Sequence, residues 1–230
     1  MTKTQLNAAI RAIYERLIRA YGPQNWWPVS LDDTSSQSVD AQIVVGAILT
    51  QNTAWANVER AIAQLGHARR LSWAALRDIS QEGLARLIRP AGTYRVKAGR
   101  IKAFVDYLWQ HYDGRFDDLV SGDLDTCRRR LLSIHGIGRE TADAILLYAA
   151  GRPSFVVDAY TRRILRRHLL IEGRASYDEV QRRFCMAMPA DPGLYNEYHA
   201  LLVEVGKRHC KPRPRCDGCP LSDMPHEAVD

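Results

Sequence analysis

The chain has 230 residues, a formal net charge of +6 and a sequence pI of about 9.2. Its 46% hydrophobic and 25% charged residues are typical of a globular protein, and no apolar run is long enough to cross a bilayer. The five cysteines, an odd number, argue against the disulfide framework of a secreted protein. We therefore expect a cytoplasmic protein with no membrane partner. The moderate basic excess suits a polyanionic partner but does not identify one.

Helical periodicity runs through most of the chain, and strand signals are scarce. Apolar residues at helical spacing predict helices over residues 4–21, 43–48, 55–65, 96–112, 126–134, 139–150 and 158–169. Ser72 and Ser80 are candidate N-caps of two short helices, the second ended by Pro90, and Ser176 with Glu179 forms a capping-box pair. The sequence predicts an all-α fold with short connections.

The segment Ile134-His135-Gly136-Ile137-Gly138 lies between two amphipathic helices. Glycines permit a tight turn at positive φ and a close approach of the backbone to another molecule. The next helix starts at once, so its free N–H groups can hold a phosphate oxygen. Such a hairpin binds a nucleic-acid backbone without reading its sequence. A simple turn between two helices is the structural alternative, because Gly-x-Gly is common.

Three segments in this order resemble the helix-hairpin-helix-Gly-Pro-Asp (HhH-GPD) DNA glycosylase superfamily, and in particular endonuclease III. They are residues 47–53 (AILTQNT), 136–142 (GIGRETA) and 155–160 (FVVDAY). The resemblance implies an enzyme that binds double-stranded DNA containing damaged bases, acts as a monomer and, in a bacterium, associates with the nucleoid. It places Gln51 in the gap left by a flipped base and makes Asp158 the catalytic aspartate. It also assigns DNA contacts to the hairpin residues Gly136, Ile137, Gly138, Arg139 and Thr141.

The resemblance further implies two helical domains. Residues 31–152 would form a six-helix barrel that contains the hairpin. Residues 1–30 and 153–230 would form a terminal helical domain with a cysteine-rich metal loop, and the active cleft would lie between the two.

Asp158 and Glu140 carry the expected chemistry. Breaking a glycosidic bond leaves positive charge on the sugar, and a fixed carboxylate can stabilise that charge and orient an attacking water. Asp158 follows an apolar stretch at a predicted helix start, so it can also be an ordinary N-cap. Bifunctional members of the family have a lysine at the position of Glu140, and a carboxylate cannot form an imine. The expected enzyme is therefore a monofunctional glycosylase that leaves an abasic site.

The segment Trp26-Trp27-Pro28, taken with residues 49–55, resembles the 3-methyladenine glycosylase branch of the superfamily. We expect Trp26, Trp27 and Glu140 to line the base pocket, because aromatic faces attract a positively charged alkylated purine. The two tryptophans could instead fill the seam between domains. The helical spacing of Trp55 with Val58 and Ile62 predicts a core position.

Cys210, Cys216 and Cys219 lie within ten residues, a density typical of metal ligands. Relatives of endonuclease III carry an iron–sulfur cluster there, with the pattern C-x6-C-x2-C-x5-C. In this chain the first gap is one residue shorter and Pro225 takes the fourth position. The alternatives are a [4Fe–4S] cluster with an unidentified fourth ligand, a Cys3His zinc site that uses His226, or a decayed site. We expect Cys127 and Cys185 to be buried thiols.

Two other functions remain open at this point. One is an endonuclease III-type glycosylase with abasic-site lyase activity on oxidised pyrimidines, against which Glu140 argues. The other is a helix-hairpin-helix protein that binds DNA without catalysis, against which Asp158 argues.

Overall fold

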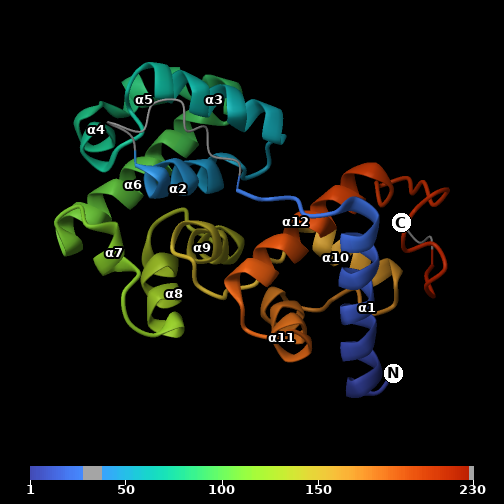
Figure 1. The fold of residues 1–230 in the computed structure, drawn as a ribbon. Helices are drawn as coiled ribbons and strands as arrows, with labels where there is room; N and C mark the ends of the chain where they lie inside the picture. Colours follow the sequence, from blue (N-terminus) through green and yellow to red (C-terminus); the bar gives the residue numbers. More distant parts are fainter. Residues whose placement is uncertain (28–37, 228–230) are drawn as a thin grey trace. The chain divides into compact units, whose positions relative to one another are not determined.

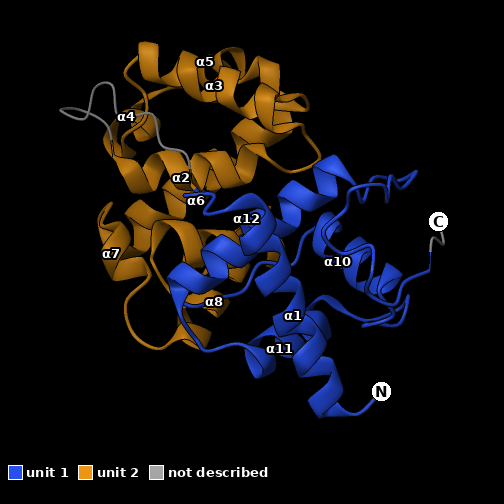
Figure 2. Cartoon of the chain, turned by 45° about the vertical axis from the view of Figure 1, so that its right-hand side comes forward, with its two compact units in different colours: residues 1–26, 153–230 blue, residues 27–152 orange. Residues whose placement is uncertain are grey.

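The computed structural model describes residues 1–27 and 38–227, shown as a ribbon in Figure 1. The described residues form helices, turns and loops and contain no β-strand, which confirms the predicted all-α fold. The chain divides into two compact units, residues 27–152 and residues 1–26 with 153–230 (Figure 2). The predicted domain boundary between residues 30 and 31 lies outside the described residues, as does Pro28.

The unit of residues 27–152 is built around one buried helix. Every residue of α2 from Ala41 to Leu49 is buried, and the helix packs on α3, α6, α9 and η2. A helix that is apolar on all faces must lie in a core. The elements of this unit are α2 (Val39–Leu49), α3 (Trp55–His67), α4 (Trp73–Asp78), α5 (Gln81–Leu87), η1 (Arg89–Ala91), α6 (Tyr94–Tyr112), α7 (Phe116–Leu119), α8 (Leu124–Ser133), α9 (Arg139–Ala144) and η2 (Ile145–Ala149).

Ser72 and Ser80 cap α4 and α5 as predicted, since each side chain accepts a hydrogen bond from a backbone N–H of the first turn. The helix expected to end at Pro90 ends earlier, at Leu87, and Pro90 lies inside the short 3₁₀ helix η1. Proline suits the first turn of a helix, where an N–H has no partner in any case. The helix predicted over residues 139–150 is α-helical only at its start and continues as the π-helical η2.

The second unit packs α1 (Lys3–Tyr21) against α11 (Tyr177–Ala187) and α12 (Pro192–Arg208), and α10 (Ala159–Arg167) against α12. The predicted capping box of Ser176 and Glu179 starts α11. Helix α12 is absent from the predicted helices, yet it supplies much of the core. Its Tyr198 is fully buried and donates its hydroxyl to the carbonyl of Ile10 at 2.6 Å. None of the described helices is both long and apolar enough to span a membrane.

Candidate active site

The predicted hairpin forms a tight turn between α8 and α9. Gly136 has a φ of 84°, a left-handed conformation that favours glycine, and Ile137 N–H donates to the carbonyl of Ile134 at 3.1 Å. Gly138 is the N-cap of α9, and no side chain caps this helix start. Gly138 is exposed, whereas Ile137 is only 5% exposed and anchors the turn to the core. The surface that the hairpin presents to solvent at Gly138 is therefore backbone, and the Ile137 side chain is not part of it.

An ion pair fastens the two hairpin helices to each other. Arg128 of α8 donates from Nε and Nη2 to the two carboxylate oxygens of Asp143 of α9, at 2.8 and 3.0 Å. The Asp143 side chain is fully buried. Bidentate pairing of this kind adds geometric precision as well as energy. The sequence analysis did not identify this pair.

Gln51 follows the end of α2 and is bound to the hairpin. Its Nε2 donates to Thr141 Oγ1 at 2.8 Å and to the carbonyl of Gly136 at 3.2 Å, and its Oε1 accepts a hydrogen bond from Arg100. The structure therefore brings together three of the predicted DNA-binding residues. Thr141 is 5% exposed and makes its contact with Gln51.

Arg139 and Glu140 occupy the exposed first turn of α9. An acidic side chain is favourable there because the N-terminus of a helix carries partial positive charge. The carboxylate of Glu140 is therefore exposed at this helix start.

The predicted pocket residue Trp27 belongs to the same unit and joins a group of three aromatic rings. Its ring centroid lies 5.0 Å from that of Trp55 and 5.0 Å from that of Tyr148. A Cβ on Gly46 would stand 2.9 Å from Trp27 Cζ2, so the indole lies directly against the backbone of α2. The core position predicted for Trp55 is wrong: Trp55 is half-buried, and its Nε1 donates to Glu59.

Asp158 lies in the other unit, at the N-cap of α10. Its Oδ1 accepts a hydrogen bond from the backbone N–H of Thr161 at 2.7 Å, so the expected capping role is confirmed. Its Oδ2 lies 3.7 Å from Nε2 of His199, and its side chain is 14% exposed. Burial acts to raise the pKa of Asp158, but His199 and the bond from Thr161 outweigh burial and lower it. The carboxyl group is therefore ionised at neutral pH.

His199 is a candidate site residue that the sequence analysis missed. It lies on α12, is 6% exposed and packs edge-to-face on Trp26 with ring centroids 6.1 Å apart. The one sequence feature that could have identified it is the position of a histidine inside an otherwise apolar run, residues 198–203. Trp26 is further held by Asn196, which binds its backbone carbonyl, and the ammonium of Lys207 lies 5.6 Å from its ring centroid.

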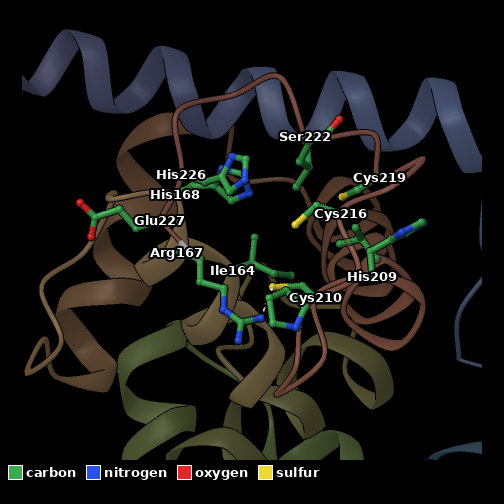
Figure 3. Close-up of a pocket in the computed structure, with 13 residues that line it drawn as sticks. Ile164, Arg167, His168, His209, Cys210, Cys216, Cys219, Ser222, His226 and Glu227 are labelled. Atoms are coloured by element: carbon green, nitrogen blue, oxygen red, sulfur yellow. Dashed lines mark hydrogen bonds between the residues drawn. The ribbon is translucent and has the colours of Figure 1, made fainter. Parts of the chain in front are cut away.

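The cysteine loop follows α12 and lines a cavity (Figure 3). Cys210, Cys216 and Cys219 face this cavity together with His168 and His226. Burial and the two neighbouring thiols raise the pKa of Cys219. Cys127 is buried as expected, but the prediction for Cys185 is wrong, since Cys185 is exposed.

Arginines of α10 hold this loop in place. Arg163 donates to the carbonyl of Cys210 at 2.6 Å, and Arg167 donates to the carbonyls of Lys211 and Pro212 at 2.6 and 2.7 Å. Arg167 also donates to Cys210 Sγ at 3.3 Å. Guanidinium groups that donate to its backbone carbonyls thus hold the loop against α10.

The donor types of the loop fit a soft metal, because thiolates and imidazoles bind iron–sulfur clusters and zinc. Within residues 1–27 and 38–227, no three or more His, Cys, Asp or Glu side chains are grouped so that they could hold a metal ion. The geometry alone does not assign a cofactor here.

Comparison with known proteins places the chain. A family model described as HhH-GPD superfamily base excision DNA repair protein matches residues 45–189. A Methanocaldococcus jannaschii protein is 44% identical over 217 residues, or 94% of each chain. It is named a DNA repair glycosylase, and that name is itself an inference. Endonuclease III of Thermotoga maritima is 30% identical over 79% of this chain and 80% of its own.

Solved structures agree. The H. pylori 3-methyladenine DNA glycosylase bound to 1,N6-ethenoadenine has a TM-score of 0.70 and 26% identity, covering 90% of this chain and 98% of that one. A non-covalent endonuclease III–DNA complex shares the fold, with a TM-score of 0.76 and 23% identity over 99% and 97% of the chains. The chain belongs to the HhH-GPD superfamily and is a DNA glycosylase of base excision repair.

Proposed function

We propose that the chain is a monofunctional glycosylase that hydrolytically removes an alkylated purine, such as 3-methyladenine, from duplex DNA. The observation that carries the proposal is Glu140 in the exposed first turn of α9. A carboxylate cannot attack the sugar to form the imine that strand cleavage requires. Water is then the nucleophile, and an abasic site is the product.

Asp158 is the proposed catalytic residue. A base in a duplex must be rotated out of the stack before its glycosidic bond can be reached. As that bond breaks, positive charge develops on the sugar, and a fixed anion nearby stabilises it. The lowered pKa of Asp158 keeps the carboxylate charged, and its bond to Thr161 fixes its orientation. Its remaining oxygen can orient or deprotonate the water.

The base pocket would use aromatic faces. A methylated purine carries positive charge, which the electron-rich face of an indole attracts. Trp26 already has the ammonium of Lys207 near its ring, which disfavours a second cation there. We therefore assign the stacking role to Trp27 and its neighbours Trp55 and Tyr148. The solved relative that binds an ethenoadenine supports a modified purine as the substrate class.

DNA backbone contacts are assigned to the hairpin. The N–H groups at the start of a helix bind phosphate oxygens, and Gly138, where an added Cβ would meet nothing within 4 Å, lets the strand come close. Arg139 adds positive charge to the same exposed turn. Gln51 is proposed to fill the gap left by the flipped base.

The second candidate is a bifunctional glycosylase and lyase acting on oxidised pyrimidines. The 30% identity to an endonuclease III favours it. A panel of duplexes distinguishes the two, each with one lesion: 3-methyladenine, 1,N6-ethenoadenine or thymine glycol. Released bases are identified by mass spectrometry. Release of an alkylated purine alone supports the proposal, release of thymine glycol alone supports the second candidate, and DNA binding with no release supports a non-catalytic role.

We also propose that Cys210, Cys216 and Cys219 bind a structural [4Fe–4S] cluster, with zinc and a His226 ligand as the alternative. The three thiols share one cavity, and the Arg167 guanidinium donates a hydrogen bond to Cys210 Sγ. His226 Nδ1 lies 2.8 Å from the carbonyl of Met224, which places the proton on Nδ1 and leaves Nε2 able to bind a metal. Metal analysis of the purified protein, with a visible absorption spectrum, decides between iron, zinc and neither. If the purified protein contains neither iron nor zinc, the site has decayed.

A further inference from the structure

Two cationic side chains of α6 reach the segment that carries Gln51. Lys97 is 1% exposed, and its Nζ donates to the carbonyl of Leu49, to Thr53 Oγ1 and to the carbonyl of Ala91, each at 2.8 Å. An ammonium has three protons, so every one is used. The three acceptors belong to the end of α2, the turn after it and η1. Lys97 therefore links the two sides of the turn that contains Gln51 to each other and to η1.

The turn that Lys97 binds contains a residue in an unfavourable backbone conformation. Asn52 has a φ of 53°, in the left-handed region that few non-glycine residues adopt. Such a conformation persists only where the surrounding structure holds it. The bond from Lys97 to Leu49 precedes this residue and the bond to Thr53 follows it. The buried ammonium thus stabilises the backbone on which Gln51 is placed.

Arg100, three residues further along α6, holds the side chain itself. It donates from Nη1 to Oε1 of Gln51, while Nε2 of Gln51 is bound to Thr141 and Gly136 of the hairpin. A Cβ on Gly136 would stand 2.3 Å from Arg100 Cγ, so the arginine lies across the bare backbone of the turn. Both ends of the Gln51 amide are therefore fixed before any DNA is bound.

We propose that Lys97 and Arg100 are positioning residues that hold Gln51 ready to fill the gap left by the flipped base. The proposal rests on the gap-filling role proposed above for Gln51. A side chain that is already oriented loses less conformational freedom when DNA binds, and base extrusion becomes easier by that amount. Neither cation needs to touch DNA for this effect.

The test uses a duplex in which a tetrahydrofuran abasic analogue lies next to 2-aminopurine, whose fluorescence reports whether the gap is filled. Wild-type protein and the Gln51→Ala variant are compared first and should differ. Arg100→Met should then give the Gln51→Ala signal while its affinity for undamaged duplex stays within about twofold. Its single-turnover rate of base release should fall roughly tenfold, the size expected for losing one hydrogen bond to a charged group. Arg100→Lys should restore part of that rate.

A double variant shows whether Arg100 acts through Gln51. If it does, Arg100→Met should have no further effect on base release in the Gln51→Ala background. Additive losses would overturn the proposal, because they would mean that Arg100 acts elsewhere. A faster Arg100→Met enzyme would also overturn it, since Gln51 would then be held back rather than made ready.

Lys97 has a matched control on the same helix. Lys102 also makes three hydrogen bonds, in its case all to backbone carbonyls, those of Leu76, Arg77 and Ile79, at 3.1, 2.8 and 3.2 Å. Lys102→Met removes the same kind of contact, but from residues 76–79 rather than from the residues that flank Gln51. Measured at temperatures that leave both variants folded, Lys97→Met should change the 2-aminopurine signal and Lys102→Met should not. Equal effects would mean that Lys97 is merely structural.

The role of Gln51 and the roles of Lys97 and Arg100 are tested by different comparisons. If wild type and Gln51→Ala give the same fluorescence, the role of Gln51 is wrong and the positioning proposal falls with it. If those two differ but Arg100→Met behaves as wild type, Gln51 fills the gap and only the positioning proposal is wrong.

Discussion

The Asp158 carboxylate is shared between a helix start and an imidazole: Oδ1 accepts the Thr161 N–H at 2.7 Å, and Oδ2 lies 3.7 Å from Nε2 of His199. The helix start supplies backbone donors and partial positive charge, and the imidazole adds a cation when it is protonated. Both keep the carboxyl group ionised although it is largely buried. An anion held in this way is suited to stabilise a positively charged sugar.

Asp158→Asn should strongly slow base release without unfolding α10. Asparagine caps a helix as well as aspartate does, so the bond to Thr161 can persist. The lost negative charge should lower the single-turnover rate by about 10²–10³, the cost of removing one electrostatic stabiliser. Binding to a duplex with an abasic analogue should stay near the wild-type value. A variant that still releases base at the wild-type rate would show that another group carries the reaction.

His199→Gln should move the acid side of the pH–rate profile to higher pH. The pKa of Asp158 is lowered, so its reactive carboxylate is present above that pKa and is lost as the pH falls through it. Removing the imidazolium raises the pKa of Asp158, and the loss of activity then begins at a higher pH. Values of kcat/KM from about pH 3.5 to 8 test this. His209→Gln, whose imidazole faces the carbonyl of Arg215, is the control and should leave the profile unchanged.

The pair of Arg128 and Asp143 should dominate the stability of the hairpin. Arg128→Met leaves a fully buried carboxylate without its guanidinium, which costs about 3–5 kcal/mol. Arg115→Met is the control, because Arg115 pairs with Asp118 on the surface, where solvent screens the charges, and its loss should change stability much less. Urea unfolding followed by circular dichroism measures both. Equal losses would mean that the buried pair does not hold the hairpin helices together.

Lys97 should make the stability of the protein rise with pH in the mildly alkaline range. Burial, with a smaller contribution from the charge of Arg100, lowers the pKa of Lys97 to about 8. In the unfolded chain a lysine keeps its proton to about pH 10.4, so between those values the unfolded state binds more protons. The free energy of unfolding therefore rises with pH across that window. The free energy of unfolding is measured against pH for the wild type and for Lys97→Met, and the difference between the two curves removes the contributions of the other titrating groups. A difference that does not change with pH would contradict the lowered pKa of Lys97.

Local sequence signals predicted the helix starts and the hairpin well, since caps and glycines act through neighbouring residues. Ser72, Ser80 and the Ser176–Glu179 box all cap helices in the structure. Contacts between distant residues gave no such signal. The hydrogen bond of Lys97 to Leu49, 48 residues away, and the electrostatic contact of Asp158 with His199 depend on packing. Trp55 was misassigned because its helical spacing matches Val58, yet its ring meets Trp27 rather than the core.

A denaturing gel of one end-labelled duplex that carries a single 3-methyladenine shows whether the enzyme removes the base without cleaving the strand. We expect an intact strand after incubation with the enzyme, cleavage of that strand at the lesion only after hot alkali, and no covalent adduct when borohydride is present. Strand cleavage without alkali, together with a borohydride-trapped adduct, would show that a lysine forms an imine with the sugar. That result would contradict the monofunctional mechanism assigned from Glu140.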